Sequence, residues 1–257
     1  VYFVGRTTQK HKTSSPSDQN GPKRTLPQFP NEKKTSTGEA LPVFDDHENF
    51  YNVIKHDHIA YRFEVISLLG KGSFGQVVLA LDHMKGKQVA LKIIRTESRF
   101  AKQAKEEIRI LETLRQMRET NKADTDGRDF PIVQLFEHFT FRKHICMTFE
   151  LLSINLYDLL KLNKFTGLPR DRVRRISFQL LKALYYVEKA GIIHCLHPED
   201  RDCIKLIDFG SSCFKKGPTY PYIQSRFYRA PEVILRLGYS QPIDIWSFGC
   251  LVAELIN

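Results

Sequence analysis

The sequence predicts an α+β fold in which a strand-rich first half carries one main helix and a mainly helical second half follows. Residues 61–95 have a strand-like pattern, and residues 100–117 then repeat apolar side chains every three or four positions, as an amphipathic helix does. A similar stripe at 173–187 predicts a long second helix, which Gly191 would end. Residues 243–256 are apolar on nearly every face, which predicts a buried helix.

Length and composition limit the class of protein. The 257 residues suffice for one large domain or two lobes, and 42% of them are apolar. No apolar run approaches the length of a membrane span, and no secretory signal is present. The five cysteines are scattered and odd in number, which is typical of reduced thiols in a cytosolic or nuclear protein. The chain has no initiator Met, and we interpret it as a fragment.

The first 58 residues differ from the rest in composition. Residues 1–40 are polar and basic, with seven Lys or Arg and three Asp or Glu, and they predict a disordered linker. Residues 44–58 mix acids with aromatics and predict a short ordered hairpin packed on a domain. The net charge of +10 suits phosphorylated or acidic partners, and no aromatic-interleaved basic motif indicates nucleic acid.

Two motifs in the first half point to phosphate chemistry. The pattern Gly70-x-Gly72-x-x-Gly75 between two strands lets backbone amides approach a phosphate closely, although a glycine-rich hairpin without a ligand has the same pattern. Lys92 follows on the next strand, 17 residues after Gly75. A lysine on a buried strand is costly unless it is paired, and Glu107 on the predicted helix is the expected partner. A surface Lys and a surface Glu are the alternative.

Residues 204–210 carry the second half of this chemistry. Asp208 follows a short apolar run, which predicts a carboxylate at a strand end where it can hold Mg²⁺ against nucleotide phosphates. Residues 149–152 end a strand and open the connection between the halves, where an adenine ring could find backbone hydrogen bonds; an ordinary connection is the alternative. A zinc site is a weaker hypothesis, because no Cys-x-x-Cys pair is present. Its ligands would be His194, Cys195, His197 and Cys203.

Two tyrosines precede two arginines in residues 220–229. A phosphate on Tyr222 could be held by Arg226 and Arg229 through charge-assisted hydrogen bonds. Packing of the arginines on aromatic rings is the alternative reading.

Taken in order, these motifs resemble the eukaryotic protein kinase superfamily, and most closely the class II branch of the dual-specificity tyrosine-phosphorylation-regulated kinases. The stretches that carry the resemblance are 56–65, 70–77, 144–153 and 222–232. The resemblance implies a two-lobed kinase fold with a β-rich N-lobe and a C-lobe truncated after its central buried helix. The expected divisions are a linker at 1–40, the family's homology box at 41–58 and a kinase domain at 59–257, with lobes 59–150 and 151–257.

The resemblance implies transfer of the ATP γ-phosphate to Ser or Thr of proteins, often near Arg and Pro, with autophosphorylation of Tyr222. The implied ATP contacts are Gly70, Lys71, Gly72, Ser73, Phe74, Gly75, Val77, Ala90, Lys92, Phe149, Glu150, Leu152 and Asn155. The implied catalytic residues are Lys92, Glu107, His194 and Asp208, with Mg²⁺ on Asp208 and Asp200. The implied activation-loop residues are Tyr220, Tyr222, Arg226 and Arg229. Asp244 would hold the catalytic loop through its backbone.

The catalytic loop departs from the family pattern His-Cys-Asp-Leu-Lys-Pro-Glu-Asn. Here His194-Cys195 is followed directly by Leu196, so the Asp that accepts the substrate hydroxyl proton is absent, and Asp200 is a doubtful substitute. His197 replaces the Lys, Asp200 replaces the Asn, and the strand expected after Asp200 to floor the adenine pocket is missing. Three hypotheses remain: a working kinase, a nucleotide-binding pseudokinase or scaffold, and a damaged fragment of an active kinase.

Overall fold

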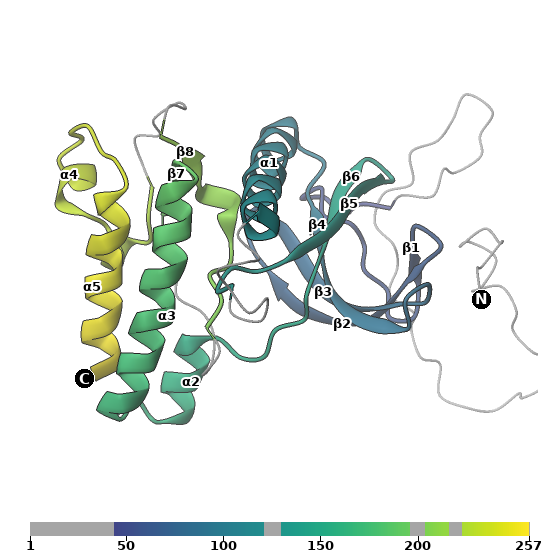
Figure 1. Ribbon diagram of the computed structural model, residues 1–257. Helices are drawn as coiled ribbons and strands as arrows, with labels where there is room; N and C mark the ends of the chain where they lie inside the picture. Colours follow the sequence, from purple (N-terminus) through teal and green to yellow (C-terminus); the bar gives the residue numbers. More distant parts are fainter. Residues whose placement is uncertain (1–43, 121–129, 196–203, 216–222, 257) are drawn as a thin grey trace, which may run out of the picture. The chain divides into compact units, whose positions relative to one another are not determined.

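The computed structural model describes residues 44–120, 130–195, 204–215 and 223–256 (Figure 1). The predicted linker at 1–40 therefore lies outside the described residues. The chain divides into two compact units, and the predicted lobe boundary at 150 stays a prediction. Unit 1 comprises Val1–Glu97, described from residue 44, and Phe139–Cys146; unit 2 comprises Ser98–His138 and Met147–Asn257. No helix in the described parts of the chain is long and apolar enough to cross a membrane.

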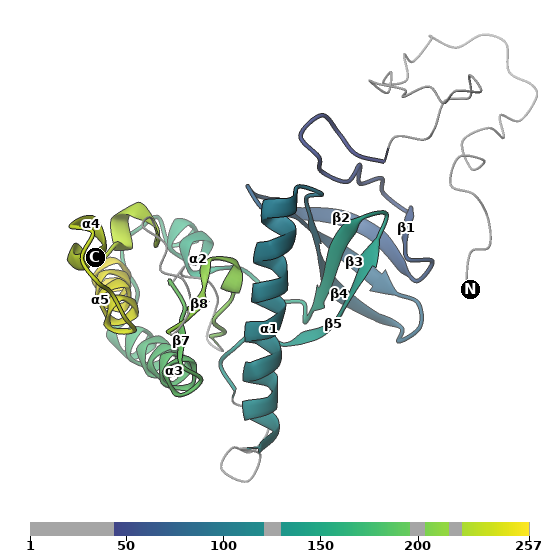
Figure 2. The same cartoon turned by 90° about the horizontal axis from the view of Figure 1, so that it is seen from above.

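A six-stranded sheet in the order β1-β2-β3-β4-β6-β5 forms most of the first half. Its strands are β1 (His58–Ile59), β2 (Phe63–Lys71), β3 (Gly75–Asp82), β4 (Lys87–Ile94), β5 (Leu135–Phe141) and β6 (His144–Phe149). The four strands β1 to β4 pair with their neighbours in antiparallel fashion, and the long β2–β3 ribbon is visible in Figures 1 and 2. Alternate residues of β3, such as Val78 and Ala80, are buried, as the strand period requires.

The predicted hairpin before the sheet is present. Asp45 and Tyr51 form an antiparallel bridge, and Asp46 N donates to Phe50 O (2.8 Å) across the turn. The Asp46 side chain accepts from the backbone N–H groups of Glu48 and Phe50, each at 2.9 Å. We call residues 44–51 the strap.

The helices follow the predicted apolar stripes. They are α1 (Ser98–Thr120), α2 (Leu156–Leu162), α3 (Arg170–Lys189), α4 (Pro231–Ile234) and α5 (Pro242–Ile256), with short 3₁₀ turns η2 (Phe209–Ser211) and η3 (Arg226–Tyr228). Asn155 caps α2 by accepting from Asp158 N (2.7 Å), and Gly191, with φ of 67°, follows the end of α3. In unit 2, α3 and α5 pack side by side (Figure 1). A two-stranded ladder of β7 (Ile192–Ile193) and β8 (Cys213–Phe214) completes this unit.

Two predictions need correction. Helix α5 is not buried on all sides, because Ile245 and Trp246 are 52% and 50% exposed; only the face with Ile243, Leu251 and Leu255 is covered among the described residues. Asp208 does not end a strand either. The run before it makes a single parallel bridge, between Leu206 and Ile132, and Pro131 has no N–H with which to extend the ladder.

Candidate functional site

In unit 1, the register of β3 and β4 brings three of the predicted ATP contacts to one face of the sheet. Val77 lies directly opposite Lys92, and Leu79 lies opposite Ala90. All four are partly exposed, whereas their neighbours Val78, Val89 and Leu91 are buried on the other face. The strand period thus presents Val77, Ala90 and Lys92 together on an accessible, mostly apolar surface with one ammonium group.

The structure gives different reasons for the presence of glycine at positions 70, 72 and 75, around the turn between β2 and β3. A Cβ on Gly75 would lie 2.3 Å from Ile93 O, so the close approach of β3 to β4 requires glycine there. A Cβ on Gly70 or Gly72 would meet nothing within 4 Å. The protein's own packing therefore does not explain glycine at 70 and 72, and close approach of a ligand would.

In unit 2, the backbone of the predicted catalytic loop is anchored by one buried carboxylate. The N–H groups of His194 and Cys195 donate to the two oxygens of Asp244, each at 2.8 Å. Ser212 Oγ donates to His194 O, also at 2.8 Å. Cys195 has a φ of 63°, which is unfavourable for a residue with a Cβ, so these bonds hold a local conformation that the chain would otherwise avoid.

His194 connects this loop to the Asp-Phe-Gly segment. Its ring is fully buried, lies edge-on to Phe209 with the centroids 4.6 Å apart, and places Nε2 2.9 Å from Ile207 O. Because a carbonyl oxygen only accepts, Nε2 is the donor in this bond. These contacts fix the ring of His194 against the Asp-Phe-Gly segment, and its predicted catalytic role stays a prediction.

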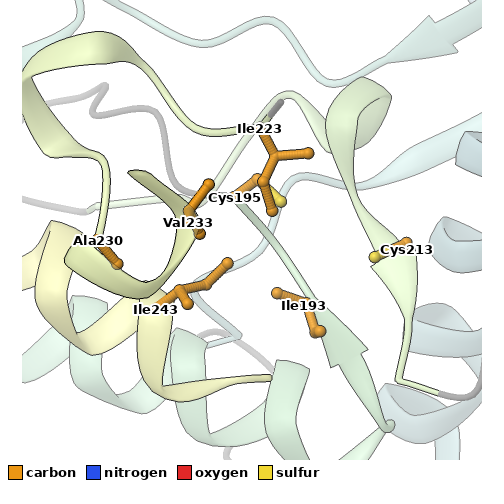
Figure 3. Close-up of a cluster of buried hydrophobic side chains, with 7 residues drawn as sticks. All are labelled: Ile193, Cys195, Cys213, Ile223, Ala230, Val233 and Ile243. Carbon is orange, nitrogen blue, oxygen red and sulfur yellow. The ribbon is translucent and has the colours of Figure 1, made fainter. Parts of the chain in front are cut away.

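An apolar cluster surrounds the same loop. Figure 3 shows its seven side chains, which come from β7 and the loop after it, β8, the activation-loop region, α4 with its N-cap residue, and α5. Its members are Ile193, Cys195, Cys213, Ile223, Ala230, Val233 and Ile243. Burial raises the pKa of the Cys195 and Cys213 thiols above the ordinary value. Both cysteines therefore pack here as small apolar side chains. The zinc hypothesis stays a prediction, because His197 and Cys203 lie outside the described residues.

Asp208 is exposed and adopts a left-handed conformation with φ of 60°. Phe209 and Gly210 beside it are buried. Helix α1 packs against this turn, and Gln103 of α1 donates from its side-chain amide to Gly210 O. The strained backbone is thus held from both sides, by His194 and by α1, and Asp208 Oδ1 accepts from Gly210 N at 3.4 Å.

The remaining predicted residues of unit 2 come from α1 and from the end of β6. Glu107 is 4% exposed on α1, whereas its expected partner Lys92 belongs to unit 1, so their pairing stays a prediction. Phe149 is buried at the end of β6, and the Glu150 carboxylate binds Lys205 Nζ at 2.7 and 2.8 Å. Glu150 also accepts from Gln134 N at 2.8 Å.

The activation-loop prediction is only partly covered. Tyr220 and Tyr222 lie outside the described residues. Arg226 is exposed, and the Arg229 guanidinium donates to Ile223 O (2.8 Å) and Gln224 O (2.9 Å). Arg229 therefore braces the backbone that follows Tyr222, and its role towards a phosphate stays a prediction.

Comparison with known families decides the identity of the fold. A family model described as a protein kinase domain matches residues 63–257. The chain belongs to the protein kinase family. Its two-part α+β arrangement and the order of its motifs agree with this membership.

This kinase is similar to several dual-specificity tyrosine-phosphorylation-regulated kinases. It is 52% identical to kinase mbk-2 of Caenorhabditis briggsae over 83% of the chain and 26% of that protein. It is 50% identical to kinase 3 of Homo sapiens over 83% of the chain and 37% of that protein, and 47% identical to kinase 2 of Drosophila melanogaster over 82% and 30%. The predicted resemblance is confirmed, and the chain spans well under half the length of these relatives.

Sequence reasoning missed the polar contacts that support the kinase motifs. Gln224, with φ of 63°, donates to Ile243 O (2.8 Å) and Ser247 Oγ (2.7 Å) and accepts from Ala230 N (2.9 Å). Nothing in the spacing of Gln224 signals these partners. Lys205 and Gln103 were missed for the same reason, because their partners are distant in the sequence.

Proposed function

We propose that the chain is a protein kinase domain of the dual-specificity tyrosine-phosphorylation-regulated type whose phosphoryl transfer is strongly impaired. Its intact function would be to transfer the ATP γ-phosphate to Ser or Thr of proteins near Arg and Pro, and to Tyr222 of its own loop. The observation that carries the impairment is Leu196 directly after Cys195, where the family pattern has Asp. Without that carboxylate, the hydroxyl proton of the substrate has no acceptor in the loop.

The hydrogen bonds that hold the His194–Cys195 backbone indicate that the loss of the catalytic Asp is a local change. Asp244 still accepts from both His194 N and Cys195 N, and His194 still reaches Ile207 O. The loop therefore begins in an anchored conformation up to Cys195, and the departures are confined to 196–203, which lie outside the described residues.

The described residues fit ATP and Mg²⁺, the ligands that kinase membership implies. Among the described residues, nothing lies within 4 Å of a Cβ built on Gly70 or Gly72, and Lys92 shares an accessible face with Val77 and Ala90. Asp208 offers an exposed carboxylate, and Mg²⁺ typically takes one or two carboxylates together with phosphate oxygens and water. When bound, Mg²⁺ would neutralise charge on the phosphates; Asp208 would hold it, with Asp200 as the second proposed ligand.

A second candidate function is nucleotide binding without transfer, as in a pseudokinase or scaffold. The same observations favour it, because Lys92, Glu107 and Asp208 are retained while the proton acceptor is not. The missing strand after Asp200 should weaken the floor of the adenine pocket. We therefore expect weak binding of Mg-ATP at best.

Transfer is tested by incorporation of radiolabelled phosphate from ATP into a basic peptide containing Ser and Pro. The chain and its Lys92→Ala variant should give the same background signal, while the human kinase 3 relative in the same assay gives a strong one. Incorporation by the chain that disappears in Lys92→Ala would contradict the impairment.

Binding is tested separately by thermal unfolding with and without Mg-ADP, because a ligand that binds only the folded state raises the midpoint. A shift of several degrees that Lys92→Ala abolishes, without transfer, would favour the scaffold function. An absent shift at millimolar Mg-ADP would reject both nucleotide-dependent functions.

A further inference from the structure

Arg95, the first residue after β4, contacts the glycine-rich turn at residues 71–75. Its backbone N–H donates to Phe74 O at 3.2 Å, and its Nη1 donates to Ser73 O at 3.1 Å. Two successive carbonyl groups of the turn are thus held by one residue. Gly72 N closes the turn by donating to Gly75 O at 2.9 Å.

The same guanidinium also reaches the strap. Arg95 Nε donates to Glu48 O at 2.9 Å, and its Cζ lies 4.7 Å from the centre of the Phe50 ring. The remaining nitrogen, Nη2, lies 2.6 Å from the carboxylate of Glu97. Each guanidinium nitrogen therefore has a partner on a different segment, an arrangement that needs the planar fork of arginine.

A second cation makes the same connection. Lys71, in the turn, places Nζ 3.9 Å from the centre of the Phe50 ring and 3.4 Å from the Asp46 carboxylate. Although burial opposes it, the N–H groups of Phe50 and Glu48 and the nearby Lys71 lower the pKa of Asp46, which favours its charged form. The buried Phe50 ring is therefore contacted by cations from the turn and from the end of β4.

The strap is itself fixed to the sheet, so it can serve as a support. The ring of the buried His144 places Nε2 2.9 Å from Asp45 Oδ1 and Nδ1 2.7 Å from Ile94 O. Thr96 Oγ1 donates to Asp45 Oδ2 at 3.2 Å, and Gln76 Nε2 donates to Tyr51 O at 2.5 Å. These bonds tie both ends of the strap to β3, β4 and β6.

We propose that Arg95 is a positioning residue that couples the strap to the glycine-rich turn and fixes the orientation of its peptide groups. In a trans peptide the carbonyl oxygen and the amide hydrogen point in opposite directions. Holding Ser73 O on Arg95 therefore turns the N–H of Phe74 to the opposite side of the turn. This inference rests on the proposed function only in its last step, in which the oriented amides of the turn serve a nucleotide phosphate.

The coupling is tested without nucleotide by amide hydrogen exchange in the full chain. The reporter is the Gly72 N–H, whose acceptor is known. Arg95→Met should raise its exchange rate about tenfold, the loss expected from one or two hydrogen bonds. Arg95→Lys keeps a cation near Phe50 but replaces the three guanidinium nitrogens by one, so it loses the fork that spans Ser73, Glu48 and Glu97 and should also accelerate exchange.

The matched control is Arg62→Met, which removes an arginine from the far end of the β2–β3 ribbon. Arg62 binds Asp82 at 2.7 and 2.5 Å, next to the Phe63–Asp82 pair at the opposite end of the ribbon from the turn. Arg62→Met should destabilise unit 1. Where the Gly72 N–H exchanges through local opening, its exchange rate should nevertheless change by less than threefold. Phe50→Leu, which alters only the strap, should accelerate Gly72 exchange if the two segments are coupled.

The outcomes separate this inference from the proposed function. Unchanged Gly72 exchange in Arg95→Met, or equal acceleration in Arg62→Met, would overturn the coupling whatever the nucleotide does. Faster exchange in Arg95→Met and Phe50→Leu, together with a Mg-ADP affinity reduced about tenfold in Arg95→Met, would support the whole inference. Faster exchange in a chain that binds no Mg-ADP would support the coupling and reject the proposed function.

Discussion

The glycine-rich turn of unit 1 and the His194–Cys195 loop of unit 2 are held in different ways. The turn is supported from outside by cationic side chains that remain partly exposed, such as Lys71 and Arg95. The loop is supported from within by the buried carboxylate of Asp244 and an apolar cluster. Exposed ion pairs contribute little free energy each, whereas a buried acceptor of two N–H groups contributes much more.

This contrast indicates which structural supports of the kinase domain do not depend on the altered part of the catalytic loop. The support of the loop lies in α5 and in the segment around Ser212, about 50 and 20 positions away along the chain, so changes at 196–203 leave it in place. The turn depends on the strap, which precedes the sheet in sequence. Each region can therefore be perturbed without touching the other.

The largest expected effect is on the buried anchor. Asp244→Asn leaves one acceptor oxygen for two N–H groups and brings an NH₂ group against the other. It should lower the free energy of unfolding by about 3–4 kcal/mol, measured by urea denaturation. Asp171→Asn, on the exposed side of the first turn of α3, is the control and should change it by less than about 0.5 kcal/mol. A loss below about 1 kcal/mol in Asp244→Asn would contradict the anchoring role.

A smaller, pH-dependent effect is expected at the buried ion pair of unit 1. Hydrogen bonds from Arg62 lower the pKa of Asp82, so the folded state favours its carboxylate. This stabilisation is complete above the unfolded pKa of about 3.9 and is lost as the pH falls through the lower folded value. Asp82→Asn should cost about 2 kcal/mol at pH 7 and progressively less below pH 4. Urea midpoints between pH 7 and 3 measure this, and a constant difference would contradict it.

The sequence was sufficient for elements whose signal is local. The apolar periods located α1, α3 and the main strands, and the Gly-x-Gly pattern located the turn, because strand and helix periods depend on near neighbours. It was insufficient where the partner is remote. The exposed face of α5 depends on what packs against Trp246, and the contacts of Arg95, Gln224 and Lys205 depend on residues up to 55 positions away. We predicted a strand before Asp208, where the structure has only a single bridge between Leu206 and Ile132. The sequence shows Pro131, but it does not show that the segment with Pro131 is the one that pairs there.

The glycines of the turn give the most local test of the comparison. Gly75→Ala would place a Cβ 2.3 Å from Ile93 O, a backbone atom that cannot rotate away. We expect a loss of about 1–3 kcal/mol in the free energy of unfolding, because β3 must move from β4. Urea denaturation measures the loss, and an unchanged midpoint would show that the β3–β4 contact is looser than the structure indicates.

Gly72→Ala separates ligand approach from folding at the same turn. Its Cβ meets no atom within 4 Å, so the free energy of unfolding should change by less than about 0.5 kcal/mol. If glycine at 72 serves the close approach of a phosphate, the same variant should lose Mg-ADP affinity by roughly tenfold, since the methyl group occupies space that only a ligand would use. Equal Mg-ADP titrations of the chain and Gly72→Ala would mean that the turn does not face the phosphates. The turn would then be a glycine-rich hairpin without a ligand, while the anchored loop of unit 2 would keep its place in the kinase fold.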